Sequence, residues 1–148
     1  MSQPIKEFRG AYRFLSNFYP CNIEWLGHTY PSVEHAFQAA KFPTHPHILA
    51  RIQGNVTPGE SKAIASAFKN LIEPSWFIFT RELVMFFLLR QKFAPGTELA
   101  RKLIQTNDAE LIEGNTWNDT FWGVCKGVGE NNLGKILMVI RSELIAME

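Results

Sequence analysis

The chain has 148 residues, a length that suits one domain, and 46% of them are hydrophobic, which excludes a disordered or fibrous chain. Its formal net charge of +1 argues against a protein that binds polyanions by charge alone, although a local basic patch remains compatible with it. Cys21 and Cys125 fit no zinc or CxxC spacing, the N-terminus has no signal-peptide pattern, and the longest apolar run, Leu83–Leu89, is too short to span a bilayer. We therefore expect a single domain over residues 1–148, in the cytoplasm, with reduced thiols and no membrane association.

The N-terminal region mixes aromatic and polar side chains without a clear period. Residues 11–20 combine aromatics with Arg13, Ser16 and Asn17, which predicts an ordered loop. The aromatic rings either fill the hydrophobic core or form part of a pocket, and the pattern leaves both interpretations open. After this loop, two β-prone pieces flank Leu26–Gly27 and predict a hairpin.

A helix predicted from Ser32 to Phe42 carries the clearest functional signal. Ser32 is placed to cap its first turn. At 100° per residue, Glu34, Gln38 and Lys41 fall within about 60° of one another, and the apolar residues share a separate arc. Such a stripe is either a solvated face with a weak ion pair or a site that combines an acid, an amide and an amine.

Further helices follow with recognisable start and stop signals. One is predicted near residues 47–53, before Gly54, and a capping box at residues 57–60 starts the next. The helix from Trp76 to Phe93 is apolar nearly all round, which predicts a place at the centre of the domain. Trp76 is either a core aromatic or a ring at the mouth of a pocket.

The C-terminal part contains a glycine-rich loop between two predicted helices. One helix is capped by Thr97, and the other begins near Asn132 and carries an apolar stripe. The glycines of the loop allow close approach of the backbone to a ligand or left-handed conformations. Within this loop, Asp119 and Trp122 place a carboxylate near a large aromatic ring.

Five segments, taken together, resemble the motifs of the NADAR (YbiA-like) family. They extend from about residue 8 to residue 144 in the order that the family has, and they are Phe14–Phe18, Glu34–Phe42, Trp76, Asp119–Gly123 and Gly129–Gly134. The resemblance implies an α+β fold: a predominantly helical single domain with a small antiparallel sheet or hairpin. It also implies a hydrolase, an N-glycosidase that cleaves the bond between a ribose unit and an exocyclic amine.

The resemblance further implies substrates and site residues. The substrates are ribosylamino-pyrimidine phosphates of the riboflavin pathway, or ADP-ribosylated guanine, free or within DNA or RNA. The catalytic residues are Glu34, Lys41 and Asp119. The candidate substrate contacts are Arg13, Ser16, Asn17, Phe18, Gln38, Trp76, Trp122, Gly123 and Asn131. The sequence departs from the family just before Trp76. Residues 72–75 are Ile-Glu-Pro-Ser, without the pair of one basic and one acidic residue that the family has close to this tryptophan.

Two mechanisms are compatible with these residues. In the first, one carboxylate orients water and stabilises an oxocarbenium-like sugar while the other acid, or Lys41, protonates the leaving amine. In the second, Lys41 attacks a ring-opened ribosylamine and forms a Schiff base that water releases. Neither mechanism requires a metal or an organic cofactor, and we assign no metal site to His45 and His47 because no third ligand lies near them.

Two alternatives to an enzyme remain. A non-catalytic module that binds ADP-ribose or a related nucleotide would use the same pocket and release no base. A structural or interaction module would instead bury its aromatic residues as core. An acid and a lysine on one helix face favour the enzyme, because simple binding does not require both. Arg13 and Lys126 are candidate phosphate contacts, and the sequence identifies no protein partner.

Overall fold

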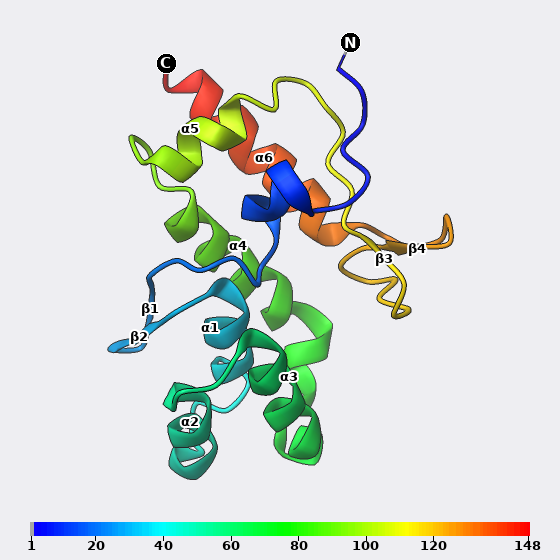
Figure 1. The fold of residues 1–148 in the computed structure, drawn as a ribbon. Coiled ribbons are helices and arrows are strands. Elements are labelled where there is room, and N and C mark those ends of the chain that lie inside the picture. The colour runs from blue at the N-terminus through cyan, green and yellow to red at the C-terminus, as the bar shows by residue number, and fades with distance from the viewer. Residues whose placement is uncertain (1) are drawn as a thin grey trace. The chain divides into compact units, whose positions relative to one another are not determined.

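The structure, a computed structural model, describes residues 2–148 and divides the chain into two compact units. The middle unit is the continuous stretch Asn17–Lys92. The end unit combines both ends of the chain, the residues up to Ser16 and Phe93–Glu148. Figure 1 labels the elements of both units. Each unit is described by itself below.

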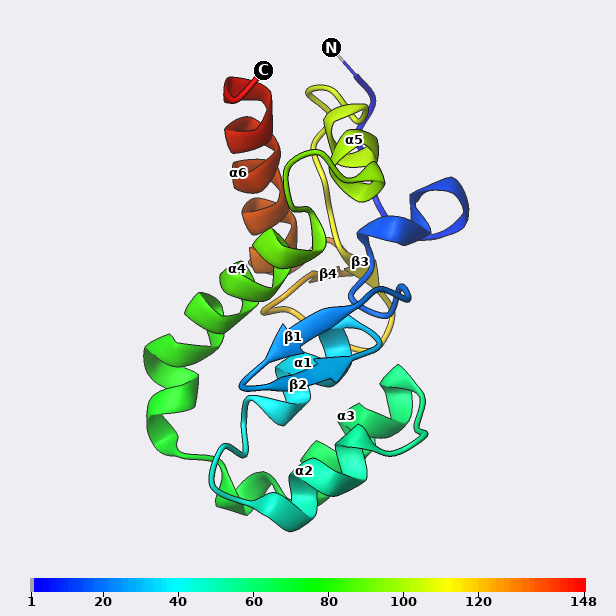
Figure 2. The same cartoon turned by 90° about the vertical axis from the view of Figure 1, so that its left-hand side faces the viewer.

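The middle unit consists of a β-hairpin followed by helices. Its elements are β1 (Ile23–Trp25), β2 (His28–Tyr30), α1 (Val33–Ala39), α2 (Pro46–Gln53), α3 (Pro58–Ala67), the 3-10 turn η2 (Lys69–Leu71), the π-helical segment η3 (Trp76–Thr80) and α4 (Arg81–Lys92). The strands are antiparallel, with Ile23 opposite Tyr30, so the predicted hairpin is confirmed. Helix α1 packs against both strands and against α2, α3 and α4 (Figure 2).

Helix α1 is buried along its whole length. The hydroxyl of Ser32 accepts a hydrogen bond from the backbone N–H of His35 at 3.1 Å, which confirms the predicted cap. Glu34 and Gln38 are only 9% and 3% exposed. The polar stripe is therefore not a solvated face. Burying these groups is costly unless they are bonded to one another or to a ligand.

The start of α3 has the capping box that its sequence predicts. Thr57 Oγ1 accepts from the backbone N–H of Glu60 at 3.1 Å, and the Glu60 carboxylate accepts from the backbone N–H of Thr57 at 2.9 Å. Pro58 occupies the first helical position, where a missing N–H costs nothing.

The helix expected at the centre of the domain is exposed along one side. Ile78 and Leu83 are 72% and 69% exposed, whereas Val84 and Leu88 of α4 are buried. The prediction of central burial was wrong because a sequence that is apolar all round does not indicate which face its neighbours cover. The first turns of this helix, η3, also have π-helical hydrogen bonding, which no sequence pattern indicated.

The end unit combines helices with a small sheet. Its elements are the 3-10 helix η1 (Gly10–Leu15), α5 (Glu98–Ile104), β3 (Gly114–Asn115), β4 (Val124–Cys125) and α6 (Asn132–Ala146). Helix α5 packs on α6 (Figure 1). The predicted loop at residues 11–20 therefore begins within a 3-10 helix. Strands β3 and β4 are parallel, and Ile5 forms a separate, isolated parallel bridge with Leu111.

Three glycines of the C-terminal loop are explained by close contacts between backbones. A Cβ atom on Gly134 would lie 2.0 Å from the carbonyl oxygen of Leu111, and one on Gly123 would lie 2.0 Å from that of Glu113. A Cβ atom on Gly129 would lie 2.1 Å from the carbonyl oxygen of Gly123. Gly134 and Gly123 let α6 and the start of β4 approach the segment before β3, and Gly129 lets the loop before α6 approach the start of β4, so these contacts are with the protein itself.

Among the helices that the structure describes, none combines the length and the apolar character needed to span a bilayer. Cys21 and Cys125 both have free thiols. Burial raises the pKa of the Cys21 thiol, although the charge of Lys92 and a hydrogen bond from the Val33 backbone act in the opposite direction.

Candidate active site

Glu34 lies in the first turn of α1, where the positive end of the helix dipole favours a carboxylate. Its backbone N–H donates to the carbonyl oxygen of Asn17 at 3.1 Å, which holds the start of the helix against the incoming chain. Gln38, one turn later, donates from Nε2 to Glu34 Oε2 at 2.5 Å. This bond fixes the orientation of the Gln38 amide, because only its nitrogen can donate to the carboxylate.

The fixed Gln38 amide leaves its own oxygen unused. Gln38 Oε1 is buried without a hydrogen-bond partner, and so is Asn17 Oδ1. The Asn17 amide nitrogen lies 3.6 Å from the sulfur of Met85, a weak acceptor. Unsatisfied buried acceptors are uncommon and need an explanation, and a ligand that donates hydrogen bonds supplies one.

Lys41 follows α1 and is half-buried beside the same carboxylate. Burial lowers the pKa of the Lys41 amine, the charges of Lys62 and Arg81 lower it further, and the charge of Glu34 partly opposes them. A lysine with a lowered pKa is more often neutral, and the neutral amine is the nucleophilic form. The surroundings of Lys41 therefore suit a reactive amine.

The aromatic rings of Phe37 and Trp76 lie next to the Lys41 amine. Lys41 Nζ lies 5.3 Å from the centroid of the Phe37 ring, and that ring lies 5.2 Å from the ring of Trp76, centroid to centroid. Trp76 is 4% exposed and is the first residue of η3. Segments of π-helix occur frequently at functional sites. Glu34, Gln38, Lys41 and Trp76 are thus linked by contacts within the middle unit, which also contains Asn17 and the 42%-exposed Phe18.

In the end unit, Asp119 closes a tight turn before Trp122. Asp119 Oδ1 accepts from the backbone N–H groups of Phe121 and Trp122 at 3.2 and 2.9 Å. The side chain of Asn115 holds the backbone of Asp119, accepting from its N–H at 3.0 Å and donating to its carbonyl oxygen at 2.9 Å. The Trp122 ring meets the Phe121 ring edge-on, with centroids 4.8 Å apart. The carboxylate and the indole are therefore held in a defined orientation.

Asn131 and Gly123 have structural roles in the end unit. The Asn131 amide accepts from the backbone N–H of Glu113 at 3.0 Å and donates to the carbonyl oxygen of Leu111 at 2.9 Å, so both of its polar atoms bind backbone. Gly123 is required by the close contact with Glu113. Of the remaining candidates, Arg13 is exposed on η1, and its carbonyl oxygen accepts from the backbone N–H of Ser16. The assignment of Asn131, Gly123, Arg13 and Ser16 as substrate contacts stays a prediction.

The predicted site residues thus divide between the two units. The middle unit contains Asn17, Phe18, Glu34, Gln38, Lys41 and Trp76, and the end unit contains Arg13, Ser16, Asp119, Trp122, Gly123 and Asn131. That both sets form one site stays a prediction from the sequence. Within residues 2–148, no cluster of three or more His, Cys, Asp and Glu side chains is arranged to hold a metal ion.

Sequence reasoning missed two residues that position candidate groups. His35, 2% exposed, has its Nδ1 2.7 Å from the Ser32 hydroxyl and its Nε2 2.8 Å from the carbonyl oxygen of Val56. It joins the start of α1 to the segment that leads into α3. Asn115 holds Asp119. The contact of His35 with Val56 joins segments 21 residues apart, which no local pattern indicates. Asn115 lies only four residues before Asp119, and that spacing was the one signal that could have found it.

The chain matches a known class of domain over nearly its whole length. The model of the NADAR domain family matches residues 5–145, and the chain belongs to that family. The solved NMR structure of the Escherichia coli protein YbiA is similar to it, with a TM-score of 0.83 and 32% sequence identity over 99% of this chain and 88% of that chain.

Curated relatives carry two kinds of name. The chain is 38% identical to a riboflavin biosynthesis protein of Vibrio vulnificus over 97% of its own length, but it spans only 39% of that protein. It is 31% identical to an N-glycosidase of Nostoc punctiforme, with 90% of this chain and 86% of that protein covered. It is 34% identical to the N-glycosidase YbiA of Escherichia coli, with 90% and 82% covered.

Proposed function

We propose that the chain is an N-glycosidase that hydrolyses the bond between a ribose unit and an exocyclic amine. The ribose carries a 5-phosphate, as in ribosylamino-pyrimidine phosphates, or belongs to ADP-ribose on guanine, free or in nucleic acid. The observation that carries the proposal is that the buried Glu34 and Gln38 lie together with the half-buried Lys41 on and after α1. The names of the relatives from Nostoc and Escherichia coli support the reaction class.

The buried carboxylate of Glu34 supplies the charge that the reaction needs. As the C–N bond breaks, positive charge develops on the anomeric carbon, and a negative oxygen in a site shielded from water stabilises it. The hydrogen bond from Gln38 holds the carboxylate in place. In this route water adds to the anomeric carbon and gives up a proton to a carboxylate, the bonding electron pair leaves with the nitrogen, and an acid donates a proton to the departing amine. We assign that acid to Asp119 or Lys41.

The lowered pKa of Lys41 supports a covalent route. A ribosylamine opens its ring to an imine, and the neutral Lys41 amine adds to C1 of that imine. The original amine then leaves with a proton, and water hydrolyses the resulting lysine imine to give free sugar and free lysine. Glu34 lies close enough to affect the Lys41 charge, so it is placed to carry protons between these steps.

The unsatisfied oxygens in the middle unit support a sugar as ligand. Gln38 Oε1 and Asn17 Oδ1 accept hydrogen bonds and are buried, so they need donors. The hydroxyl groups of a ribose are donors of suitable size. In this proposal the flat base stacks on an aromatic ring, a contact that is worth about 1–3 kcal/mol per base.

Direct assay tests the proposal. The chain is incubated with a ribosylamino-pyrimidine 5-phosphate and, separately, with an oligonucleotide that carries ADP-ribosylated guanine, and released ribose 5-phosphate or ADP-ribose is measured by mass spectrometry. We expect release from at least one substrate. Glu34→Gln, which keeps the shape of the side chain, should lower kcat about 100-fold or more.

The matched control is Glu82→Gln, because Glu82 is an exposed carboxylate on α4 of the same unit. It should keep the wild-type rate, and both variants should melt cooperatively. Wild-type turnover by Glu34→Gln would defeat the assignment of Glu34. Tight binding of free ADP-ribose without release of base from either substrate would instead identify a non-catalytic binding module.

A further inference from the structure

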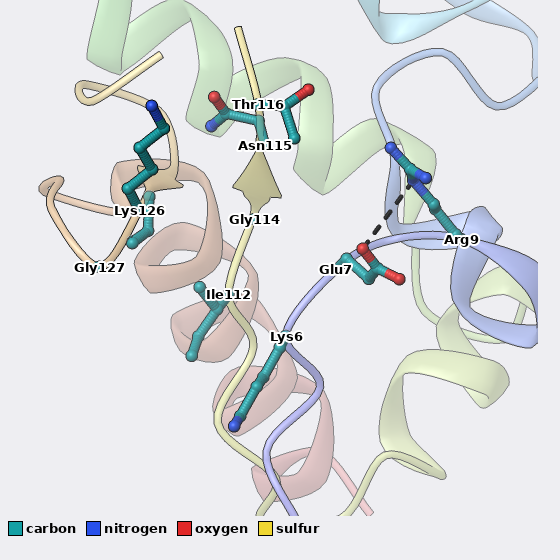
Figure 3. Close-up of a pocket in the computed structure, with 10 residues that line it drawn as sticks. Lys6, Glu7, Arg9, Ile112, Gly114, Asn115, Thr116, Lys126 and Gly127 are labelled. Atoms are coloured by element: carbon teal, nitrogen blue, oxygen red, sulfur yellow. Dashed lines mark ion pairs between the residues drawn. The ribbon is translucent and has the colours of Figure 1, made fainter. Parts of the chain in front are cut away.

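The pocket at the small sheet of the end unit, about 360 Å³ in volume, has basic side chains that do not converge on one point (Figure 3). Lys6 and Lys126 extend to opposite ends of it. The carbonyl oxygen of Lys6 also fills the space over Gly114, 2.1 Å from where a Cβ atom would lie. A single anion cannot contact both lysines, so the lining of this pocket does not define a ligand.

An apolar stripe on the outer side of α4 gives a clearer indication of a binding surface. Phe79, Leu83 and Phe87, which we call the outer stripe, follow one another at intervals of four residues from η3 into α4, and each is more than half exposed. Residues at this spacing lie on one side of a helix. Val84 and Leu88 face the other way and are buried, and α4 packs against α1 (Figure 2). Within residues 2–148, the outer stripe is therefore left largely uncovered.

The apolar surface extends beyond the outer stripe at both ends. Exposed Ile78 precedes Phe79, and at the other end the Trp25 ring meets the Phe87 ring edge-on, with centroids 5.8 Å apart, next to exposed Leu26. A whole aromatic side chain covers about 150–250 Å², so each of the exposed side chains contributes on the order of 100 Å². Together they present on the order of 500 Å², which matches the largest apolar patches of monomers, about 300–600 Å² and often functional. This area supplies a large part of the about 800 Å² that each partner buries in a standard interface.

The charges beside the outer stripe suit a second copy of the same chain. Exposed Glu82 lies just before the stretch from Leu83 to Phe87 and exposed Arg90 just after it, with the Arg90 guanidinium 5.4 Å from the centroid of the Phe86 ring. If two copies of α4 pair antiparallel about a two-fold axis, Leu83 of each lies opposite Phe87 of the other. Glu82 then lies only about 3 Å along the helix axis from Arg90 of the other copy. Parallel pairing would instead bring like charges together.

We propose that the outer side of α4 is a dimer interface, in which two copies of this chain pair their outer stripes antiparallel about a two-fold axis. Leu83 packs on Phe87 of the other copy, and Glu82 forms an ion pair with Arg90 of the other copy, so each dimer contains two such ion pairs. The proposal is independent of the glycosidase activity, because Glu34 and Lys41 take no part in the pairing.

Analytical ultracentrifugation of the full chain over a range of concentrations tests the proposal. We expect a reversible dimer, with twice the 16.9 kDa mass of one chain at the upper end of the range. Leu83→Glu should raise the dissociation constant at least about tenfold, because it places a charge in the apolar contact. Since Leu83 is exposed, this variant should stay folded, which circular dichroism checks. The control is Val139→Glu, at an exposed apolar residue of α6, and it should change the dissociation constant less than about twofold.

Reversal of the two charges tests the antiparallel arrangement. Glu82→Arg and Arg90→Glu should each weaken the dimer about tenfold, because each turns two ion pairs into two repulsive pairs. The double variant restores opposite charges between the copies, so its dissociation constant should return to within about twofold of the wild-type value. A double variant as weak as the single ones, a dimer that Leu83→Glu leaves intact, or a monomer at every concentration would overturn the proposal.

Discussion

Lys41 has surroundings that oppose its charge more than they favour it. Burial, Lys62 and Arg81 lower the pKa of its amine, and Glu34 raises it. Between the lowered pKa and the ordinary value of 10.5, the unfolded chain binds more protons at this position than the folded one. The contribution of Lys41 to the free energy of unfolding therefore increases with pH across that window. In the folded state the charged form of Lys41 is less favoured than in the unfolded chain, and the neutral, reactive form is more populated.

We predict the direction in which neighbouring charges move the Lys41 titration. Glu34→Gln removes the charge that raises the pKa, so the midpoint should fall further, whereas Lys62→Met should raise it. The midpoints are measured by ¹³C NMR of labelled lysine side chains. The wild-type protein is the reference for both variants. A Lys41 midpoint that is the same in both variants as in the wild type would contradict the prediction.

Borohydride trapping separates the two catalytic routes at the same residue. If Lys41 forms an imine, reduction during turnover should attach the sugar covalently to the protein, and mass spectrometry should find the adduct on Lys41. Lys41→Ala should give no adduct, and Lys69→Ala, at an exposed lysine of the same unit, should give the wild-type amount. Full turnover without any adduct would leave the route in which water attacks directly.

At the scale of elements, Gly134 of α6 packs so closely against the Leu111 backbone that no larger residue fits there. We predict that Gly134→Ala lowers the free energy of unfolding by about 3 kcal/mol, because the added carbon would collide with the carbonyl oxygen of Leu111. Gly96→Ala is the control. Gly96 has a φ of 83° but no atom near its Cβ position, so its cost should be about 1 kcal/mol. Urea unfolding measures both, and equal costs would refute the explanation from packing.

The elements that the sequence predicted well are those with local causes. The hairpin at Leu26–Gly27, the Ser32 cap and the Thr57 capping box each depend on residues within a few positions of one another. The π-helical start at Trp76 and the exposed side of α4 depend on distant packing, so no periodicity indicated them. The burial of the polar stripe on α1 was left open for the same reason.

At the scale of the whole molecule, the candidate site also combines features that local patterns predicted with features that depend on distant contacts. Helical spacing alone placed Glu34, Gln38 and Lys41 on one stripe, and the family resemblance added Trp76 and Asp119. The sequence did not indicate that Asn131 would use its amide to bind backbone, or that Lys62 and Arg81 would affect the Lys41 charge. Those interactions join segments far apart in the chain, and side-chain partners of this kind have no local signature.

We propose that the two units form a single domain, since one family model matches residues 5–145. Two helix caps test this. Thr57→Ala removes the cap of α3 in the middle unit, and Thr97→Ala removes that of α5 in the end unit, each at a cost of about 1 kcal/mol. In a single domain, both variants should lower the midpoint of one common unfolding transition, followed by circular dichroism and by tryptophan fluorescence. Two separate transitions, each sensitive to one variant, would contradict the assignment.

The end unit combines residues from the first and last parts of this sequence, and Ile5 pairs with Leu111 there in a parallel bridge. During synthesis Ile5 is made before Asn17–Lys92, and Leu111 is made after it. The segment around Ile5 therefore stays without this partner while the whole of Asn17–Lys92 is made and begins to fold. We expect the newborn polypeptide to form the contacts around α1 early, and to pair Ile5 with Leu111 only after translation has passed Leu111.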